Sequence, residues 1–284
     1  QYAQSTLILL LLAVGLTGCS SINTTQAIQE IPEIAPGVLM GYTPMDEPMD
    51  SKVFVLPAPT PGSARQAMDE AIAKEMIALR GTPRWELATK DAHLRFPEAA
   101  DTFACALGLP ITEANTPALY MLLRRTLADL GLAAYSAKNA YQRERPFMTN
   151  GEPICTPEEE TMLRSDGSYP SGHTAIGWGW ALILSELAPD RAAALLDRGR
   201  AYGESRNVCN VHWRSDVIAG RMVGAAAVAR LHTNEAFLSA RSAARAEIVA
   251  MRDMNLPPGP QCAEESRVLA QASGFSSRQR PPVY

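Results

Sequence analysis

Apolar residues recur at three- and four-residue spacing along most of the chain, which is the periodicity of amphipathic helices. This pattern predicts helices over residues 64–79, 116–141, 190–202, 213–231 and 235–251. Residues 174–187 are apolar at nearly every position and predict a buried central helix. Thr156-Pro157-Glu158-Glu159 combines an N-cap residue, a first-turn proline and a capping-box glutamate, so a short helix is expected to begin there. Strand-like alternation is almost absent, and the predicted fold class is all-α.

The regions around these helices divide the chain. Residues 20–62 are rich in Pro, Ser, Thr and acidic residues with weak periodicity, and we interpret them as a tether and an irregular N-terminal wrap. Residues 63–256 form the predicted helical domain, in which the Gly-, Ala- and Val-rich run 219–229 permits close helix packing. Beyond Pro257 a loop-like tail, 257–284, is expected, with residues 276–284 frayed.

The first residues resemble a targeting segment. Residues 7–16 are a ten-residue apolar run, too short to cross a bilayer and of the length of a signal-peptide core. The following Leu16-Thr17-Gly18-Cys19-Ser20 is typical of a bacterial lipoprotein cleavage site, which predicts a signal peptide over 1–19 and lipidation of Cys19. An ordinary secretory signal is the alternative. Both imply export to the periplasm, and lipidation would add an anchor in the outer membrane.

Composition excludes several classes of protein. The chain has 284 residues, of which 46% are hydrophobic and 20% charged, and its formal net charge is -4. These fractions exclude a disordered, collagen-like or multi-span membrane protein. The acidic balance offers no basic face for nucleic acid.

Export changes the interpretation of the cysteines. Apart from Cys19 the chain contains Cys105, Cys155, Cys209 and Cys262, an even number in an oxidising compartment. They predict two disulfides, for which three pairings exist. We favour Cys105–Cys155 with Cys209–Cys262.

A first candidate cluster is Lys138-x6-Arg145-Pro146. Seven residues are about two helical turns, so both cations would lie on one face of a helix that Pro146 ends. By itself this pattern is more typical of a solvated basic stripe.

A second cluster, Pro170-Ser171-Gly172-His173, comes directly before the apolar helix. Helix N-termini expose unpaired N–H groups and partial positive charge, which suit an anion and favour a neutral imidazole. Gly172 would allow a ligand to approach the backbone closely. Ordinary helix capping explains the Ser-Gly pair equally well.

The third cluster is Ser205-Arg206-x5-His212-x3-Asp216. His212 and Asp216 are four residues apart, so on a helix the carboxylate reaches the imidazole, fixes its tautomer and directs the other ring nitrogen outward. Residues 207–211 are expected to break the helix and bring Arg206 back toward His212. An isolated His–Asp pair is more often a structural hydrogen bond.

Together the three clusters resemble the signature of the PAP2 and vanadium-haloperoxidase superfamily, and within it the bacterial class A non-specific acid phosphatases. The similarity extends to Asp50-Ser51-Lys52, the Leu56-Pro57-Ala58-Pro59 turn, Gly167-Ser168-Tyr169, Gly177-Trp178 and Cys209-x2-His212-Trp213-x-Ser215-Asp216-Val217. It runs from about Gly41 to Met251.

The resemblance implies a helical-bundle acid phosphatase that hydrolyses small phosphomonoesters without a metal or other cofactor. Lys138, Arg145, Ser171, Gly172 and Arg206 would hold the phosphate. His212, oriented by Asp216, would be the nucleophile and form a phosphohistidine, and His173 would be the general acid. An acidic pH optimum, inhibition by vanadate and a homodimer are further expectations.

Other functions use related sites. A vanadium-dependent haloperoxidase would use the same residues to hold vanadate, with His212 as the metal ligand. Phosphotransfer to alcohols and hydrolysis of nucleotide diphosphates would also fit the same residues. A non-catalytic lipoprotein that binds phosphate is opposed by the intact pair His173 and His212, and a membrane-embedded lipid phosphatase by the absence of long apolar segments after residue 19.

Overall fold

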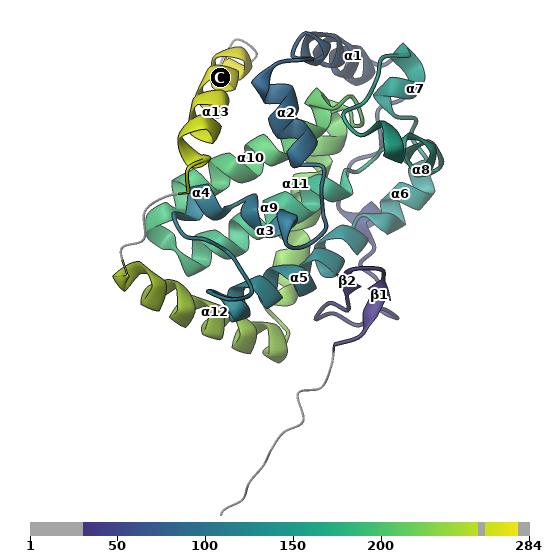
Figure 1. The fold of residues 1–284 in the computed structure, drawn as a ribbon. Coiled ribbons are helices and arrows are strands. Elements are labelled where there is room, and N and C mark those ends of the chain that lie inside the picture. The colour runs from purple at the N-terminus through teal and green to yellow at the C-terminus, as the bar shows by residue number, and fades with distance from the viewer. Residues whose placement is uncertain (1–30, 255–258, 278–284) are drawn as a thin grey trace, which may run out of the picture. The chain divides into compact units, whose positions relative to one another are not determined.

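The computed structural model describes residues 31–254 and 259–277. The chain divides into two units, Gln1–Ile31 and Pro32–Tyr284, and every element below belongs to the second (Figure 1). The predicted signal peptide and Cys19 lie outside the described residues. No helix in the described ranges is both long enough and apolar enough to span a membrane.

The described elements are mostly helical, as the periodicity predicts. The N-terminal part contains β1 (Glu33–Ala35), β2 (Val38–Leu39), the 3-10 helix η1 (Ser51–Val53), α1 (Ala64–Ile77), α2 (Pro83–Lys90), α3 (Glu98–Asp101) and α4 (Ala104–Leu107). The middle contains α5 (Pro117–Leu132), α6 (Tyr135–Tyr141), α7 (Pro146–Asn150), η2 (Pro157–Glu159), α8 (Glu160–Ser165) and α9 (Gly172–Leu187). The last part contains η3 (Pro189–Arg191), α10 (Ala192–Val208), α11 (Arg214–Leu231), α12 (Glu235–Asp253) and α13 (Cys262–Ser277). The two short strands pair antiparallel.

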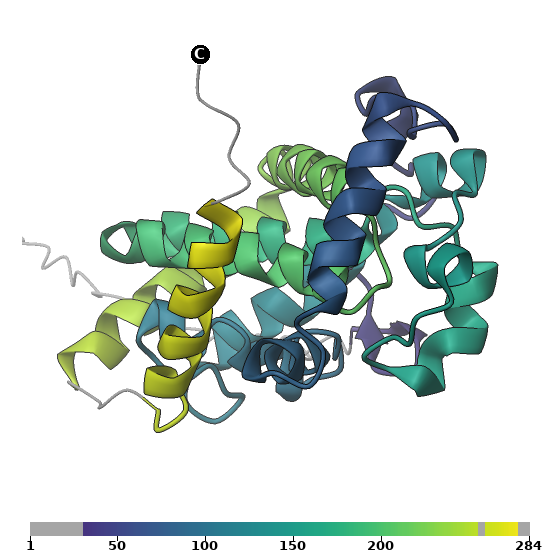
Figure 2. The same cartoon turned by 90° about the horizontal axis from the view of Figure 1, so that it is seen from above.

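Helix α9 is the centre of the domain. It packs against α10, α11 and α5, and α12 covers α5 and part of α9 (Figures 1 and 2). Trp180 on α9 is fully buried, and its ring packs in T-shaped contacts with the rings of Phe96 and Phe103. The all-apolar segment therefore forms the buried helix that the sequence predicts.

Close packing of α11 on α9 depends on two glycines. A Cβ atom at Gly220 would lie 2.5 Å from Ser171 O, and one at Gly224 would lie 2.5 Å from Ala175 O. Because any side chain there would force the helices apart, the predicted close approach is confirmed. It brings the start of α9 against α11, where two of the three sequence clusters lie.

Several predicted helix boundaries need correction. The single helix predicted over 116–141 is two helices, α5 and α6, and α10 continues six residues past the predicted end at 202. The segment at Thr156 begins as a 3-10 turn before α8, and the Thr156 hydroxyl donates to the Glu159 carboxylate instead of capping a backbone N–H. Hydrophobic spacing carries no signal for the short break at residues 133–134 or for the last turns of α10.

The prediction of a loop beyond Pro257 is wrong, because α13 occupies Cys262–Ser277. Three contacts hold this helix on the domain. Cys262 is bonded to Cys105 on α4, Glu265 pairs with the buried Arg198 on α10, and Val268 is buried. All of them come from distant segments, so local sequence could not show them.

All four cysteines form disulfides, but the favoured pairing is wrong. The bonds are Cys105–Cys262 and Cys155–Cys209. Cys155 and Cys209 are packed together in a small hydrophobic cluster that is separate from the main core beside Cys105. The pairing follows this division of the core, which spacing along the chain does not reveal.

Removing the Cys155–Cys209 bond by a double alanine substitution is expected to reduce the free energy of unfolding by roughly 4 kcal/mol, because the bond closes a 54-residue loop. Denaturant unfolding measures the loss. The matched control replaces Cys105 and Cys262, whose bond joins α4 to α13. Because only Cys209 lies close to Arg206 in the chain, only the first variant should also lose activity at temperatures where both remain folded. Equal activity in the two variants would contradict this link.

Candidate active site

The three sequence clusters meet in one place. Their members come from α6, the start of α7, the start of α9, the end of α10 and the junction with α11, and they are Lys138, Arg145, Ser171, Gly172, His173, Arg206, His212 and Asp216. Nη1 of Arg145 lies 3.2 Å from Nε2 of His212. Lys138 and Arg206 also act electrostatically on His212. Residues up to 78 positions apart therefore form a single buried site.

Lys138 and Arg145 reach this site from two helices, not from one face of a single helix as predicted. Helix α6 ends at Tyr141, and Gln142 takes a left-handed conformation with φ 42°. Pro146 is the first residue of α7, so it begins a helix where the sequence analysis expected it to end one. Both cations are nonetheless buried in the predicted cluster.

The turn after α10 fixes His212 relative to Arg206. The helix continues through Val208, and Asn210 has a φ of 60°. The N–H groups of Val211 and His212 both donate to the Arg206 carbonyl at 3.2 Å. The predicted helix break therefore exists, near the end of residues 207–211. It holds the His212 imidazole close to the turn that carries Arg206.

Asp216 orients the imidazole as predicted, although not along one helix. His212 lies before α11, which begins at Arg214, and its Nδ1 is 3.3 Å from Asp216 Oδ2. The same oxygen accepts from the Trp213 N–H at 2.7 Å and from the Ser168 hydroxyl. Because a carboxylate only accepts, the Nδ1 nitrogen carries the proton and Nε2 presents its lone pair.

The site favours an uncharged His212. Burial is the largest cause that lowers its pKa well below 6.5, and Arg145, Lys138 and Arg206 lower it further. The imidazole therefore keeps its Nε2 lone pair in acidic solution, where an ordinary histidine would be protonated.

Asp216 has buried partners that the sequence analysis missed. Arg143 Nη1 donates to Asp216 Oδ1 at 2.6 Å, and Arg143 Nη2 donates to Asp69 on α1 at 2.7 Å. Asp69 also accepts from the Ser215 N–H at 2.9 Å. No spacing rule links Asp69 to a site more than a hundred residues away, and only the packing of α1 against α11 makes the contact.

Arg206 is the most unusual member of the site. Its side chain is fully buried, and within the described part of the chain none of its three guanidinium nitrogens has a hydrogen-bond partner. Burial lowers the pKa of Arg206 to about 10, so the group stays charged at neutral and acidic pH. A buried cation with unused N–H donors is costly, and the donor set matches an oxyanion.

Lys138 and Arg145 share a carboxylate that the sequence analysis did not single out. Lys138 Nζ lies 2.6 Å and Arg145 Nη2 2.9 Å from Asp166 Oδ2. Burial and the neighbouring Arg145 lower the pKa of Lys138 to about 8, which leaves it protonated in acid. The position of Asp166, a few residues before Ser171, was the one sequence feature that could have indicated that this carboxylate lies near the site.

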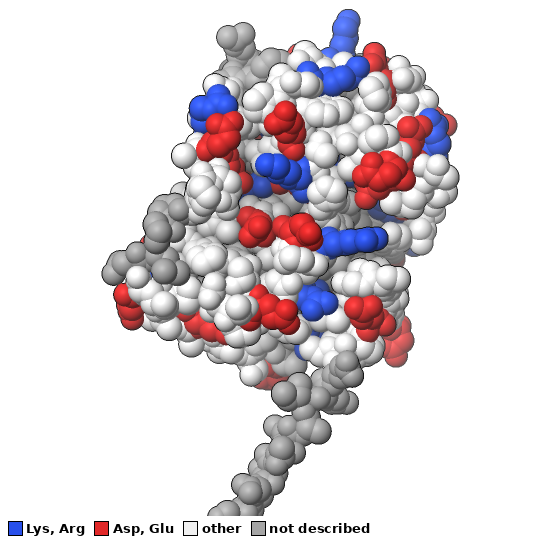
Figure 3. Space-filling model, in the orientation of Figure 1, with Lys and Arg blue, Asp and Glu red and all other residues white. Residues whose placement is uncertain are grey.

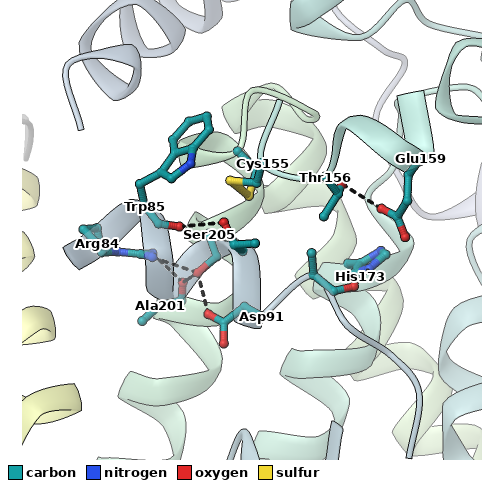
Figure 4. Close-up of a disulfide and its surroundings, with 12 residues drawn as sticks. Arg84, Trp85, Asp91, Cys155, Thr156, Glu159, His173, Ala201 and Ser205 are labelled. Carbon is teal, nitrogen blue, oxygen red and sulfur yellow. Dashed lines mark hydrogen bonds between the residues drawn. A yellow bond between two sulfur atoms is a disulfide. The ribbon is translucent and has the colours of Figure 1, made fainter. Parts of the chain in front are cut away.

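The second histidine is held from another direction. Nε2 of His173 lies 3.0 Å from the carbonyl oxygen of Ala92, so this nitrogen carries a proton. The preceding residue, Asp91, accepts from the Ser205 hydroxyl (Figure 4). Asp91 also accepts from Arg198. Burial, followed by Arg206, lowers the pKa of His173 well below 6.5.

Ser171, which the sequence predicts to bind phosphate, has a structural role at the start of α9. Its side chain caps α9 by accepting from the Thr174 N–H at 3.2 Å, and its N–H donates to Asp216 O at 3.0 Å. At Gly172 a Cβ would meet only Gly131 O, at 3.8 Å. Packing in the protein therefore does not require glycine at position 172.

The positive charge of this site is not displayed on the face seen in Figure 3, where basic and acidic side chains are interspersed. Lys138, Arg145 and Arg206 are 4%, 1% and 0% exposed. These three cations are therefore almost entirely shielded from solvent.

Comparison with known proteins connects this geometry to a family. The model of the PAP2 superfamily matches residues 117–237, which include every member of the cluster. The chain is 42% identical over 203 residues to an acid phosphatase of Zymomonas mobilis subsp. mobilis, covering 70% of this chain and 75% of the relative. It is 41% identical over 212 residues to a non-specific acid phosphatase of Providencia stuartii, covering 74% and 86%. It is 40% identical over 204 residues to a non-specific acid phosphatase of Salmonella typhimurium, covering 72% and 82%.

These similarities extend over most of the chain and agree with the helical fold and with the residues gathered around His212. The chain therefore belongs to the PAP2 superfamily and, within it, to the acid phosphatases.

Proposed function

We propose that this acid phosphatase hydrolyses phosphate monoesters through a phosphohistidine on His212, with the charge of the phosphate balanced by protein cations. The observation that carries the proposal is the buried, unpartnered guanidinium of Arg206 beside an imidazole whose tautomer is already fixed. Phosphoryl transfer needs donors around the equatorial oxygens and a nucleophile in line with the leaving group.

The phosphate would take its donors from three cations. Arg206 contributes a guanidinium with all of its N–H groups free, and Lys138 contributes its ammonium. Nη1 of Arg145 now donates to the His212 lone pair that the reaction uses. Binding of the ester would transfer that N–H to a phosphate oxygen, which frees Nε2 when substrate is present.

The first chemical step forms the Nε2–P bond and breaks the bond from phosphorus to the ester oxygen. His173 keeps its Nε2 proton on Ala92 O, so it gives the departing alkoxide a proton from Nδ1, gained when the negative charge of the bound ester stabilises the imidazolium. Asp216 stabilises the charge that develops on His212. In the second step a water gives its proton to His173 and attacks phosphorus, which breaks the N–P bond. Inorganic phosphate is released and both histidines return to their starting states.

Export completes the proposal. The apolar run 7–16 and the sequence around Cys19 support secretion to the periplasm, with a lipid anchor if Cys19 is modified. Vanadate, a tetrahedral oxyanion that can expand its coordination, is expected to inhibit the enzyme at the same site.

Replacing Arg206 by glutamine is expected to lower kcat/KM for p-nitrophenyl phosphate by about 10²–10³ and to raise the inhibition constant of inorganic phosphate. Assays in EDTA keep the test independent of added metal. The melting temperature should be unchanged or higher, because the substitution removes a buried charge without a hydrogen-bond partner.

The matched control is Arg200→Gln on the same helix, where the arginine pairs with Asp197 and Glu204 at the surface. It should leave both constants within about twofold of the wild type. If Arg206→Gln behaves like this control, the phosphate does not bind at the site described.

A further inference from the structure

Asp166 is a carboxylate placed among the cations of the site. It lies one residue after α8, and its Oδ2 atom accepts from both Lys138 and Arg145. Its side chain is 26% exposed, whereas those of Lys138 and Arg145 are 5% and 1% exposed. Asp166 therefore contacts these cations from the side that solvent reaches.

The carboxylate uses donors that a phosphate would need. Lys138 Nζ also donates to Gly167 O at 2.7 Å, so two of its three N–H groups already have acceptors. Arg145 Nε donates to Leu163 O, and Nη1 donates to Val211 O and faces His212 Nε2. For these two cations, most of the donor capacity is already taken. Arg206 alone, among the three cations of the described site, has all of its nitrogens unpartnered.

We infer that Asp166 competes with the phosphate for Lys138 and Arg145 and thereby weakens the affinity of the site for oxyanions. The inference rests on the proposed function, in which these residues bind the phosphate. Two acceptors that share one nitrogen lie roughly 4.5 Å apart when each is at hydrogen-bond distance. A phosphate bound to Lys138 would therefore lie close to a second negative charge in a poorly solvated site.

This competition has a function in turnover. Inorganic phosphate carries the same oxygens as the substrate, so three cations that bind the ester tightly would also retain the product. A carboxylate that takes back Lys138 and Arg145 favours departure of the phosphate. It also returns both side chains to fixed positions before the next substrate arrives.

A purely structural role for the same ion pairs makes the opposite prediction. If Asp166 only holds Lys138 and Arg145 in place, its loss should disorder both donors and weaken oxyanion binding. If it competes, its neutralisation should strengthen binding. Asparagine separates the two roles, because its amide oxygen can still accept from both cations while the negative charge is gone.

The test measures inorganic phosphate as a competitive inhibitor of p-nitrophenyl phosphate hydrolysis by wild type and Asp166→Asn at one acidic pH. We expect the inhibition constant to fall about tenfold or more, KM to fall with it, and kcat not to rise. The matched control is Glu160→Gln on α8, where the glutamate pairs with the exposed Arg164 and touches none of the three cations. It removes the same charge and should change the constant by less than twofold.

An inhibition constant that is unchanged or higher in Asp166→Asn would overturn the inference. Arg206→Gln separates that failure from failure of the proposed function. If Arg206→Gln weakens phosphate binding while Asp166→Asn does not strengthen it, only the competition is wrong. If neither variant changes the constant, the phosphate site itself is wrong. Should Asp166→Asn not fold, Asp166→Ser removes the same charge, and calorimetric titration with inorganic phosphate gives the same comparison.

Discussion

His212→Ala is expected to lower kcat for p-nitrophenyl phosphate by about 10⁴ or more, because it removes the group that forms the covalent intermediate. His173 is not an equivalent substitute, because Ala92 O holds its ring through Nε2 and the proposed mechanism uses it as the proton donor. Steady-state kinetics gives kcat, and rapid quenching after mixing with labelled substrate gives the amount of phosphoenzyme.

The quenched wild-type enzyme should carry label that is stable in base and lost in acid, as a phosphohistidine is. His232→Ala is the matched control, since His232 lies directly after the far end of α11, pairs with Glu186 on α9 and should be dispensable for turnover. Acid-labile, base-stable label trapped on the His212→Ala protein would show that another residue is the nucleophile.

Replacing Asp216 should lower kcat less than replacing His212, because the Asp216 carboxylate acts only through the imidazole. Its partners Arg143, Ser168 and the Trp213 N–H hold it from three directions. These contacts keep His212 in one tautomer before the substrate arrives. Binding of the substrate therefore does not have to supply the free energy that orients the imidazole.

How much of this could be predicted from the sequence differs from feature to feature. Helix α12 is long and periodic, and α9 is a nearly continuous apolar run, so the apolar pattern alone predicted both. The residues of the site were identified because each belongs to a short motif that resembles a known family. That resemblance placed His212, Arg206 and Lys138 in one site even where the predicted local helix geometry was wrong.

Lys138 and Arg145 do not share one helical face, because α6 ends just before Gln142. A single left-handed residue ends α6, and Arg145 then precedes a new helix. Both side chains still reach the cluster, where they pair with the same carboxylate oxygen of Asp166. Periodicity cannot detect a break of one residue, and it cannot show which acidic residue lies opposite a cation.

The tertiary partners were beyond sequence reasoning for a different reason. Asp69, Ala92 and Asp91 contact the site from α1 and from the segment after α2, both far from the motifs in sequence. The Cys155–Cys209 bond likewise lies in the smaller hydrophobic cluster, and the Cys105–Cys262 bond joins α4 to α13 across the fold. Such contacts depend on the whole fold, and a single sequence does not encode them in any local pattern.

The electrostatics of the two histidines imply an acidic working range. Burial and the cations lower the pKa of both His212 and His173. For the nucleophile this is favourable, because it must be neutral to attack. For the general acid His173 the lowered pKa is unfavourable in the free enzyme. When a phosphate is bound, its negative charge offsets that of Arg206 and stabilises the protonated imidazole. The protonated fraction of His173 therefore falls as pH rises, and activity should fall with it.

His173→Ala is expected to lower kcat by about 10²–10⁴ for an alkyl phosphate and by a clearly smaller factor for p-nitrophenyl phosphate. An alkoxide needs a proton in order to depart, whereas nitrophenolate is a good leaving group without one. The two substrates are measured on the same protein preparation, so any general damage to the site affects both and cancels in the ratio.

The pH profile provides a second, independent readout of the same residue. In the wild type, kcat for the alkyl phosphate should decline as pH rises through the pKa of His173 in the complex, and this decline should be absent in His173→Ala. Equal losses for the two substrates would mean that the position supports the site without transferring a proton. Retention of the wild-type pH dependence in the variant would assign the titrating acid to a different group.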